Sequence, residues 1–150
     1  MRRSSVLMIA FLTSFFPVAS IADGDAFLKA VTFALMGSDA SPPTVVNRED
    51  CIFQVVTGKN VETYHLNNVD PSRTRFTRMM LRNPDGPPTN ITNVDIYGED
   101  TVYESGSAGG WSSTQLKSKT LVVRTEESDR LIRAWKFIYE NGCKGKASSF

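Results

Sequence analysis

The stretch CIFQVVTGKNVETYHL, Cys51 to Leu66, is the clearest guide to the architecture. Its first half, Cys51–Thr57, is a short apolar run with β-branched and aromatic residues, which is typical of a strand. Gly58–Asn60 is a loop of hairpin length that contains glycine, and Val61–Leu66 alternates between apolar and polar residues. The stretch therefore predicts a β-hairpin and an antiparallel sheet built around it.

A period close to two continues along the chain after this hairpin. Arg73–Arg82 predicts a third strand and Lys119–Thr125 predicts the last one. Between them, Thr92–Gly98 and Thr101–Ser105 are expected to form a tight hairpin over the turn GED. The prolines and the glycine of Asn83–Asn90 interrupt the pattern. We expect an antiparallel meander of five to six strands.

Two amphipathic helices flank the strands. Asp25–Met36 carries one apolar stripe, with Asp25 as its N-cap and Gly37 just past its end. In Ser128–Asn141 the large apolar residues crowd onto about one third of the circumference. Helices segregated to the ends of a run of strands indicate an α+β fold, with the C-terminal helix packed on the sheet. A curled sheet plugged by that helix, like a pleckstrin-homology barrel, is one specific form.

The N-terminal residues 1–22 have the three parts of a secretory signal peptide. Arg2 and Arg3 precede the apolar run Val6–Ala19, and small residues precede a predicted cut before Asp23. An uncleaved anchor is the alternative, although the run is short for a membrane span, which needs about 20 residues. The rest, residues 23–150, has the size of a single domain. The sequence thus predicts a secreted or periplasmic protein with no membrane span after cleavage.

Cys51 and Cys143 are the two cysteines of the chain. In an oxidising compartment they most simply form one disulfide, which would pin the last helix to the start of the sheet. In the chain-entropy model so long a loop is worth about 4–5 kcal/mol. Two free thiols or an intermolecular bridge are alternatives, and a redox pair would usually lie closer in sequence. Residues 144–150 lack periodicity and predict a frayed tail.

Composition and charge exclude some classes of function. The chain has 17 basic and 16 acidic residues, and removal of Arg2 and Arg3 leaves the mature chain with one more acid than base. A neutral domain lacks the electrostatic footprint of a nucleic-acid binder. The sequence contains no pair of cysteines or histidines at metal-ligand spacing. It therefore predicts no nucleic-acid partner, no cofactor and no metal site.

His65 is the single histidine, and it is a catalytic candidate only if partners converge on it in three dimensions. Glu62 lies three positions earlier in the same predicted strand, so it points to the opposite face. A half-exposed strand histidine without a catalytic role is the competing interpretation. No complete catalytic constellation is visible in the sequence.

Three residues are candidates for contact with a ligand or partner. Trp111 lies in the glycine- and serine-rich stretch Gly106–Ser113, which predicts a mobile hairpin loop, and it could anchor a partner or fold back onto the sheet. Arg73 and Arg75 share a strand face by parity and could hold a carboxylate or a phosphate. Alternatively, the arginines solubilise an edge strand.

Four stretches together resemble small secreted proteins of unassigned function from alphaproteobacteria. They are FALMGSD (Phe33–Asp39), VVNREDCIFQVV (Val45–Val56), YHLNNVD (Tyr64–Asp70) and RAWKFIYENGCKG (Arg133–Gly145). The resemblance implies a bacterial, periplasmic setting and paired cysteines. It implies no activity, cofactor or catalytic residue.

We therefore expect a small secreted or periplasmic binding module without catalysis. Its partner would be an unknown protein, peptide or small ligand, held by the sheet face, an edge strand or the loop beside Trp111. The alternative is a small hydrolase-type enzyme that uses His65.

Overall fold

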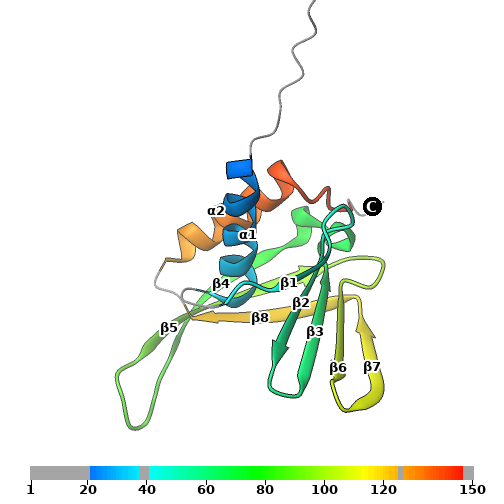
Figure 1. Ribbon diagram of the computed structural model, residues 1–150. Helices are drawn as coiled ribbons and strands as arrows, with labels where there is room; N and C mark the ends of the chain where they lie inside the picture. Colours follow the sequence, from blue (N-terminus) through cyan, green and yellow to red (C-terminus); the bar gives the residue numbers. More distant parts are fainter. Residues whose placement is uncertain (1–20, 38–40, 125–126, 147–150) are drawn as a thin grey trace, which may run out of the picture.

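The computed structural model describes residues 21–37, 41–124 and 127–146, and the predicted signal segment up to residue 20 lies outside the described residues. It confirms the α+β class, with a helix at each end of the described chain and eight strands between them (Figure 1). The elements are α1 (Ile21–Met36), β1 (Thr44–Asn47), β2 (Ile52–Thr57), β3 (Asn60–His65), η1 (Leu66–Asn68), η2 (Pro71–Arg73), β4 (Arg75–Leu81), β5 (Thr89–Tyr97), β6 (Tyr103–Ser107), β7 (Gly110–Leu116), β8 (Ser118–Arg124) and α2 (Ser128–Asn141).

The strands form two antiparallel sheets, and within the described residues neither closes into a barrel. One sheet has the order β1-β2-β3-β6-β7 and the other the order β4-β5-β8. The predicted hairpin is confirmed as β2–β3, in a register that pairs Phe53 with Tyr64. The chain leaves the first sheet after β3, returns after β5 and leaves again at Lys117, between β7 and β8.

The predicted hairpin between Thr92–Gly98 and Thr101–Ser105 is wrong. These segments belong to β5 and β6, which lie in different sheets. The backbone itself explains the change of sheet. Gly98 passes so close to η1 that a Cβ on it would lie 2.0 Å from the Asn68 carbonyl oxygen, and its N–H donates to the Lys117 carbonyl at 2.9 Å.

The stretch Gly106–Ser113, predicted as a mobile loop, instead contributes to two paired strands. β6 and β7 pair from Tyr103 with Leu116 down to Ser107 with Gly110, and only Ala108 and Gly109 separate them. Their polar, glycine-containing residues show no apolar alternation, so the periodicity that revealed β2 and β3 is missing here.

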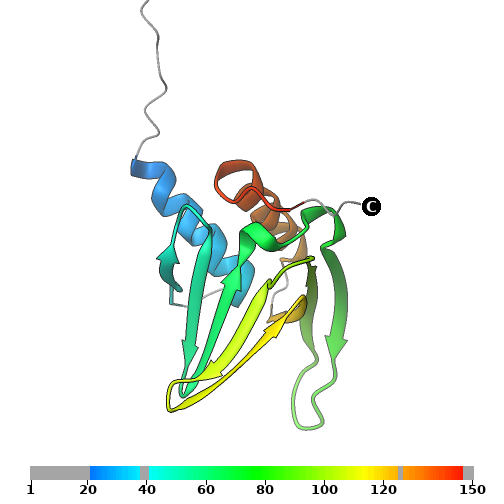
Figure 2. The same ribbon diagram turned by 90° about the vertical axis from the view of Figure 1, so that its right-hand side faces the viewer.

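Both helices cover the same side of the sheets and pack against each other (Figures 1 and 2). α1 ends as predicted, with Gly37 at φ +87° and its N–H bonded to the Phe33 carbonyl, although the helix begins four residues before Asp25. The buried core draws on both helices and both sheets. Its largest fully buried members are Tyr64, Phe53, Leu66, Ile96, Leu131, Ile138, Val31, Val69, Val94, Val102 and Val123.

The predicted disulfide joins Cys51 and Cys143. The two Cα atoms lie 5.6 Å apart across a sequence separation of 92 residues, and each cysteine is 1% exposed. Just before Cys143, a Cβ on Gly142 would lie 2.2 Å from the Phe27 ring, so the end of α2 fits against α1 only with glycine there. The bridge therefore ties the end of α2 to the start of β2, and the close approach of Gly142 to Phe27 places the same end against α1.

The described part of the predicted tail is held in place rather than frayed. The N–H of Lys144 donates to Asn67 Oδ1 and that of Lys146 to the Val69 carbonyl, each at 2.8 Å. Lys146 also forms an ion pair with Asp100. These bonds attach the residues after the disulfide to the segment around η1. Residues 147–150 lie outside the described residues.

Within the described ranges, no helix has the length and apolar character needed to cross a membrane.

We expect the double variant Cys51→Ala/Cys143→Ala to lose about 4 kcal/mol of unfolding free energy, because the bridge restricts the unfolded chain over a long loop. Urea unfolding followed by circular dichroism measures the loss. The wild-type protein in reducing agent is the matched control and should unfold at the midpoint of the variant. A variant as stable as the oxidised wild type would contradict this role.

Candidate ligand-binding site

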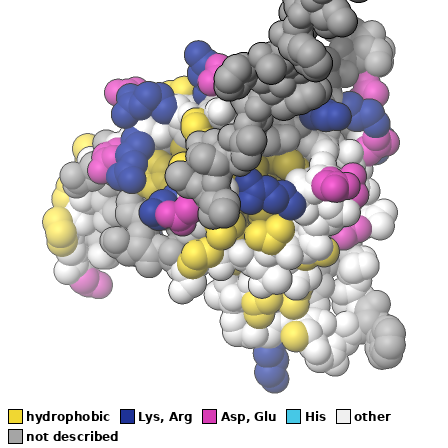
Figure 3. Space-filling view, turned by 45° about the horizontal axis from the view of Figure 1, so that its top comes forward, with side chains coloured by type: hydrophobic (Ala, Val, Ile, Leu, Met, Phe, Trp, Pro, Cys, Tyr) yellow, Lys and Arg dark blue, Asp and Glu magenta, His cyan; other side chains and the backbone are white. Residues whose placement is uncertain are grey.

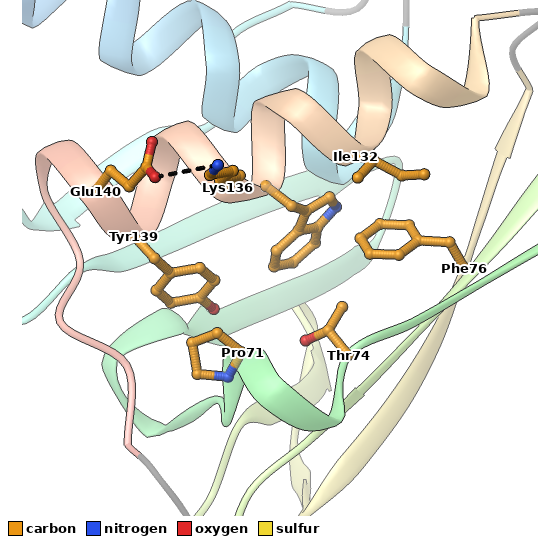
Figure 4. A pocket seen from close by; sticks show the side chains of 8 residues that line it. Pro71, Thr74, Phe76, Ile132, Lys136, Tyr139 and Glu140 are labelled. Carbon is orange, nitrogen blue, oxygen red and sulfur yellow. Dashed lines mark ion pairs between the residues drawn. The ribbon is translucent and has the colours of Figure 1, made fainter.

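A pocket of about 290 Å³ opens between α2 and the segment that runs from η2 into β4. Figure 4 shows Pro71 and Thr74 on one side and the α2 side chains on the other, with the Phe76 ring directed toward Ile132. Its volume is at the lower end of the range for small-molecule sites. Its lining residues are Pro71, Thr74, Phe76, Ile132, Trp135, Lys136, Tyr139 and Glu140.

The turn at η2 holds the floor of the pocket. Asp70 is 1% exposed, and its carboxylate accepts hydrogen bonds from the Ser72 N–H at 2.9 Å and the Ser72 hydroxyl at 2.6 Å. Pro71 occupies the first turn, where its missing N–H costs no hydrogen bond. The Thr74 hydroxyl donates to the Asp70 carbonyl at 3.3 Å. These local bonds give Pro71 and Thr74 fixed positions.

Trp135 supplies the innermost wall. It is 2% exposed, and its ring stacks on that of Tyr139 at a centroid distance of 6.2 Å and an interplanar angle of 25°. The indole Nε1 is buried without a hydrogen-bond partner. A buried donor left unpaired costs about 1–3 kcal/mol. An acceptor that reached this nitrogen, after the side chains covering it had moved, would recover that free energy.

Tyr139 offers no second free donor. Its hydroxyl donates to the Leu66 carbonyl at 3.3 Å, and burial, assisted by the charge of Asp70, raises the pKa of this phenol. The hydroxyl therefore stays protonated and keeps its bond to the backbone. Its ring then serves the pocket only as an apolar surface.

The rim of the pocket is charged and its side wall is apolar. Lys136 and Glu140 form an ion pair at 3.6 Å, marked in Figure 4, and both are exposed. Ile132, which the sequence places on the buried stripe of the helix, is instead 39% exposed at the opening. Such a site accepts a compact apolar group while the rim stays in water.

The predicted placement of Arg73 and Arg75 on one strand face is wrong, whereas contact of either arginine with a ligand stays a prediction. Arg73 lies in η2, and its guanidinium carbon sits 5.3 Å from the ring centroid of Tyr97. Arg75 begins β4 and is exposed. The alternation of side chains did not place Arg73 correctly, because the strand starts two residues later than predicted. The interpretation that the arginines belong to an edge strand fits Arg75 but not Arg73, because β4 forms one edge of its sheet.

Trp111 lies in β7, next to the turn of the β6–β7 hairpin. Its side chain lies outside the described residues, so its role as a partner contact stays a prediction.

His65 has a carboxylate partner, Glu104, which lies on a distant strand and was not predicted from the sequence. Its Nε2 is 3.1 Å from Glu104 Oε2 on β6, and Gln115 donates to the other Glu104 oxygen at 3.2 Å. In the part of the chain that the structure describes, no hydroxyl or thiol is hydrogen bonded to His65. The pair lacks a nucleophile, and a catalytic role for His65 stays a prediction.

A polar cluster connects the two sheets. Glu62 on β3 accepts hydrogen bonds from the Tyr103 hydroxyl at 2.7 Å and the Tyr64 hydroxyl at 2.9 Å. Lys119 on β8 donates to Glu62 at 3.3 Å and to the Tyr103 hydroxyl at 3.0 Å. Glu62 thus points away from His65, as predicted. The cluster's members satisfy one another, which favours a structural role.

The cluster shifts the pKa values of its members. Burial by itself raises the pKa of Glu62, but the hydrogen bonds from the two tyrosines and the charge of Lys119 outweigh it, so the pKa falls below its ordinary value of 4.5. Burial lowers the pKa of Lys119, yet its bond with Tyr103 and the charge of Glu62 reverse this and raise it. Both groups are therefore charged at neutral pH.

Charges of both signs are mixed on one face of the molecule. On the face in Figure 3, basic and acidic side chains alternate with apolar patches, and neither sign gathers into a single field. Among the described residues, no three His, Cys, Asp or Glu side chains are grouped so that they could hold a metal ion.

Comparison with known proteins gives no relative: no protein-family model matches the chain, and neither a curated protein nor a solved structure is significantly similar to it.

The sequence contained partial signals for the pocket. Trp135 and Tyr139 were visible on the apolar stripe of α2, but the stripe predicts burial and not a cavity. Pro71 and Thr74 sit in a turn whose distance from α2 along the chain hides their proximity. Only the β4–α2 packing brings the two halves together.

We expect Glu62→Gln to lower the unfolding free energy by about 1 kcal/mol at pH 7, allowing for solvent screening of a carboxylate that is 33% exposed. Because the folded pKa of Glu62 is lowered, its contribution is full above the unfolded pKa of about 4.5 and disappears as the pH falls through the folded value. Urea unfolding of both proteins between about pH 3 and 8 measures this.

Glu140→Gln is the matched control, because its ion pair is exposed, and it should change the unfolding free energy by less than about 0.5 kcal/mol. A Glu62→Gln penalty that is equal at pH 3 and pH 7 would show that the ionised carboxylate does not hold the sheets together.

Proposed function

We propose that this protein is a small binding module that takes a compact apolar group of its ligand into the pocket under α2. The observation that carries the proposal is Trp135, which combines an apolar wall with a buried, unpaired indole donor. The preferred group has a flat apolar body and one hydrogen-bond acceptor, because this combination fills the pocket and satisfies Nε1.

The proposed compartment is the periplasm or the extracellular space. Three observations support it: the signal-like segment before Asp23, the disulfide between Cys51 and Cys143, and the resemblance to secreted alphaproteobacterial proteins. A ligand met there would be a peptide, a protein segment or a small molecule in the cell envelope or outside it.

A hydrolase that uses His65 is the less supported alternative. The Glu104 carboxylate could orient the imidazole, as the third member of a triad does. The alternative still requires a nucleophile within reach of His65, and the contacts of the described residues supply none.

The binding proposal is tested with two probes of the same shape, acetophenone and α-methylstyrene, which differ in a carbonyl oxygen against a methylene group. We expect acetophenone to bind about tenfold more tightly, because only its oxygen can accept from Trp135 Nε1–H. Titrations followed by ¹H–¹⁵N NMR report the indole N–H directly. Trp111→Phe leaves Trp135 as the single indole signal.

Ile132→Glu should abolish binding of both probes by placing a charge in the wall of the pocket. Val122→Glu is the matched control, since Val122 is a 63% exposed apolar residue that is not part of the pocket lining. Equal affinity for the two probes would refute the role of the indole donor. Absence of binding by both would refute the pocket as a ligand site.

A further inference from the structure

The free edge of β4 runs beside the pocket under α2. In the described residues β4 pairs only with β5, and Figure 2 shows it at the outside of the molecule. On alternate residues of an edge strand, the N–H and C=O groups point away from the sheet and have no ladder partner. Phe76 of β4 is also a wall of the pocket. A chain that paired with β4 would therefore pass the mouth of the pocket.

Beyond Phe76 the same strand exposes a row of large apolar side chains. Met79 is 49% exposed, Met80 63% and Leu81 53%. Soluble proteins usually protect a sheet edge with charges, prolines or a covering segment, and β4 has the charges of Arg75 and Arg78, but its last three residues are uncharged. Consecutive exposed apolar residues on such an edge are instead typical of an interaction surface. Because side chains alternate along a strand, Met80 lies on the face of Phe76, and Met79 and Leu81 lie on the opposite face. The strand thus offers backbone hydrogen bonds along its edge and apolar contacts on both faces.

The charges along β4 indicate which partner fits this edge. Arg75, Arg78 and Arg82 lie on the strand or directly after it, with no acidic residue among them. Arg78 forms an ion pair with Asp129 of α2, whereas Arg75 and Arg82 have no ion pair in the described part of the chain. Arg75 lies opposite Asp95 of β5 in the strand register without forming an ion pair with it. Cations at both ends of the strand favour a partner with carboxylates at both ends. A second copy of β4 would bring arginines of the two chains together.

We propose that the β4 edge is the docking site of an extended acidic peptide segment, which adds a strand to the sheet and places one bulky apolar side chain in the pocket under α2. This inference rests on the proposed function, since it names the partner that carries the apolar group. Phe76 and Arg78 share the face of β4 that meets α2. Side chains on the same face of the added strand would point toward the pocket.

The probe is the fluorescein-labelled nonapeptide EDTVFVTDE, and KKTVFVTKK is its charge-reversed control. Fluorescence anisotropy at about 0.15 M salt should show that the acidic peptide binds about tenfold more tightly than the control. The variant Arg75→Glu/Arg82→Glu should lose that preference. Lys117→Glu/Arg124→Glu is matched in net charge change, lies away from the β4 edge and should change the affinity by less than about twofold.

Backbone pairing is tested with two further peptides, each N-methylated on alternate residues in one of the two possible sets. An added strand uses the N–H groups of one set only, so one peptide should lose binding and the other should keep it. Amide shifts in ¹H–¹⁵N NMR should concentrate on β4 and on the α2 residues of the pocket. The Ile132→Glu variant should bind the peptide more weakly, as it should acetophenone.

Each outcome separates the peptide partner from the pocket. Acetophenone binding without a preference for the acidic peptide would overturn the peptide docking and leave the pocket intact. Equal binding by both N-methylated peptides, or amide shifts away from β4, would overturn the added strand. A protein that sediments as a dimer through β4 would assign this edge to a second copy. Absence of binding by both acetophenone and the peptide would overturn both proposals.

Discussion

The covalent tie between the end of α2 and the start of β2 is the constraint on which the other contacts depend. Cys51 does more than hold Cys143, because its carbonyl accepts the Leu66 N–H at 3.0 Å. The Leu66 carbonyl in turn accepts the hydroxyl of Tyr139, in the last turn of α2. The bridge, the end of the first hairpin and one wall of the pocket are therefore one connected unit. A shift of α2 would disturb all three.

The second constraint is the passage of the chain between its two sheets. Each crossing places strands that are neighbours in sequence in different sheets. The crossing at Gly98 needs a residue without a side chain, because the Asn68 carbonyl occupies the space of a Cβ. Away from the helices, Lys119 reaches across to Glu62 and joins the sheets through a polar cluster instead of an apolar core. The helices and this cluster thus hold the sheets at different places.

Local patterns carried enough information for the fold class, the β2–β3 hairpin, both helices and the disulfide. They failed where long-range packing decides. The tight turn expected after Gly98 is replaced by a change of sheet, and β6–β7 has polar residues that leave no apolar period. The pocket was the feature least predictable from the sequence, because Pro71 and Trp135 come together only through the docking of α2 beside β4. Arg73 was assigned to a strand that begins after it, which moved it to the wrong surface.

The pocket and the free β4 edge have a common origin, because the three-stranded sheet is too narrow to cover α2 completely. The sheet that contains β4 has only three strands, and at its edge Phe76 is the single β4 side chain that lines the pocket against α2. Ile132 therefore stays 39% exposed and the Trp135 donor stays unpaired, which together cost a few kcal/mol. A domain of this size has a total stability of only about 5–15 kcal/mol. The disulfide offsets that cost without covering the pocket, so the bridge that closes the domain also allows one side of α2 to stay open, as the proposed binding function requires.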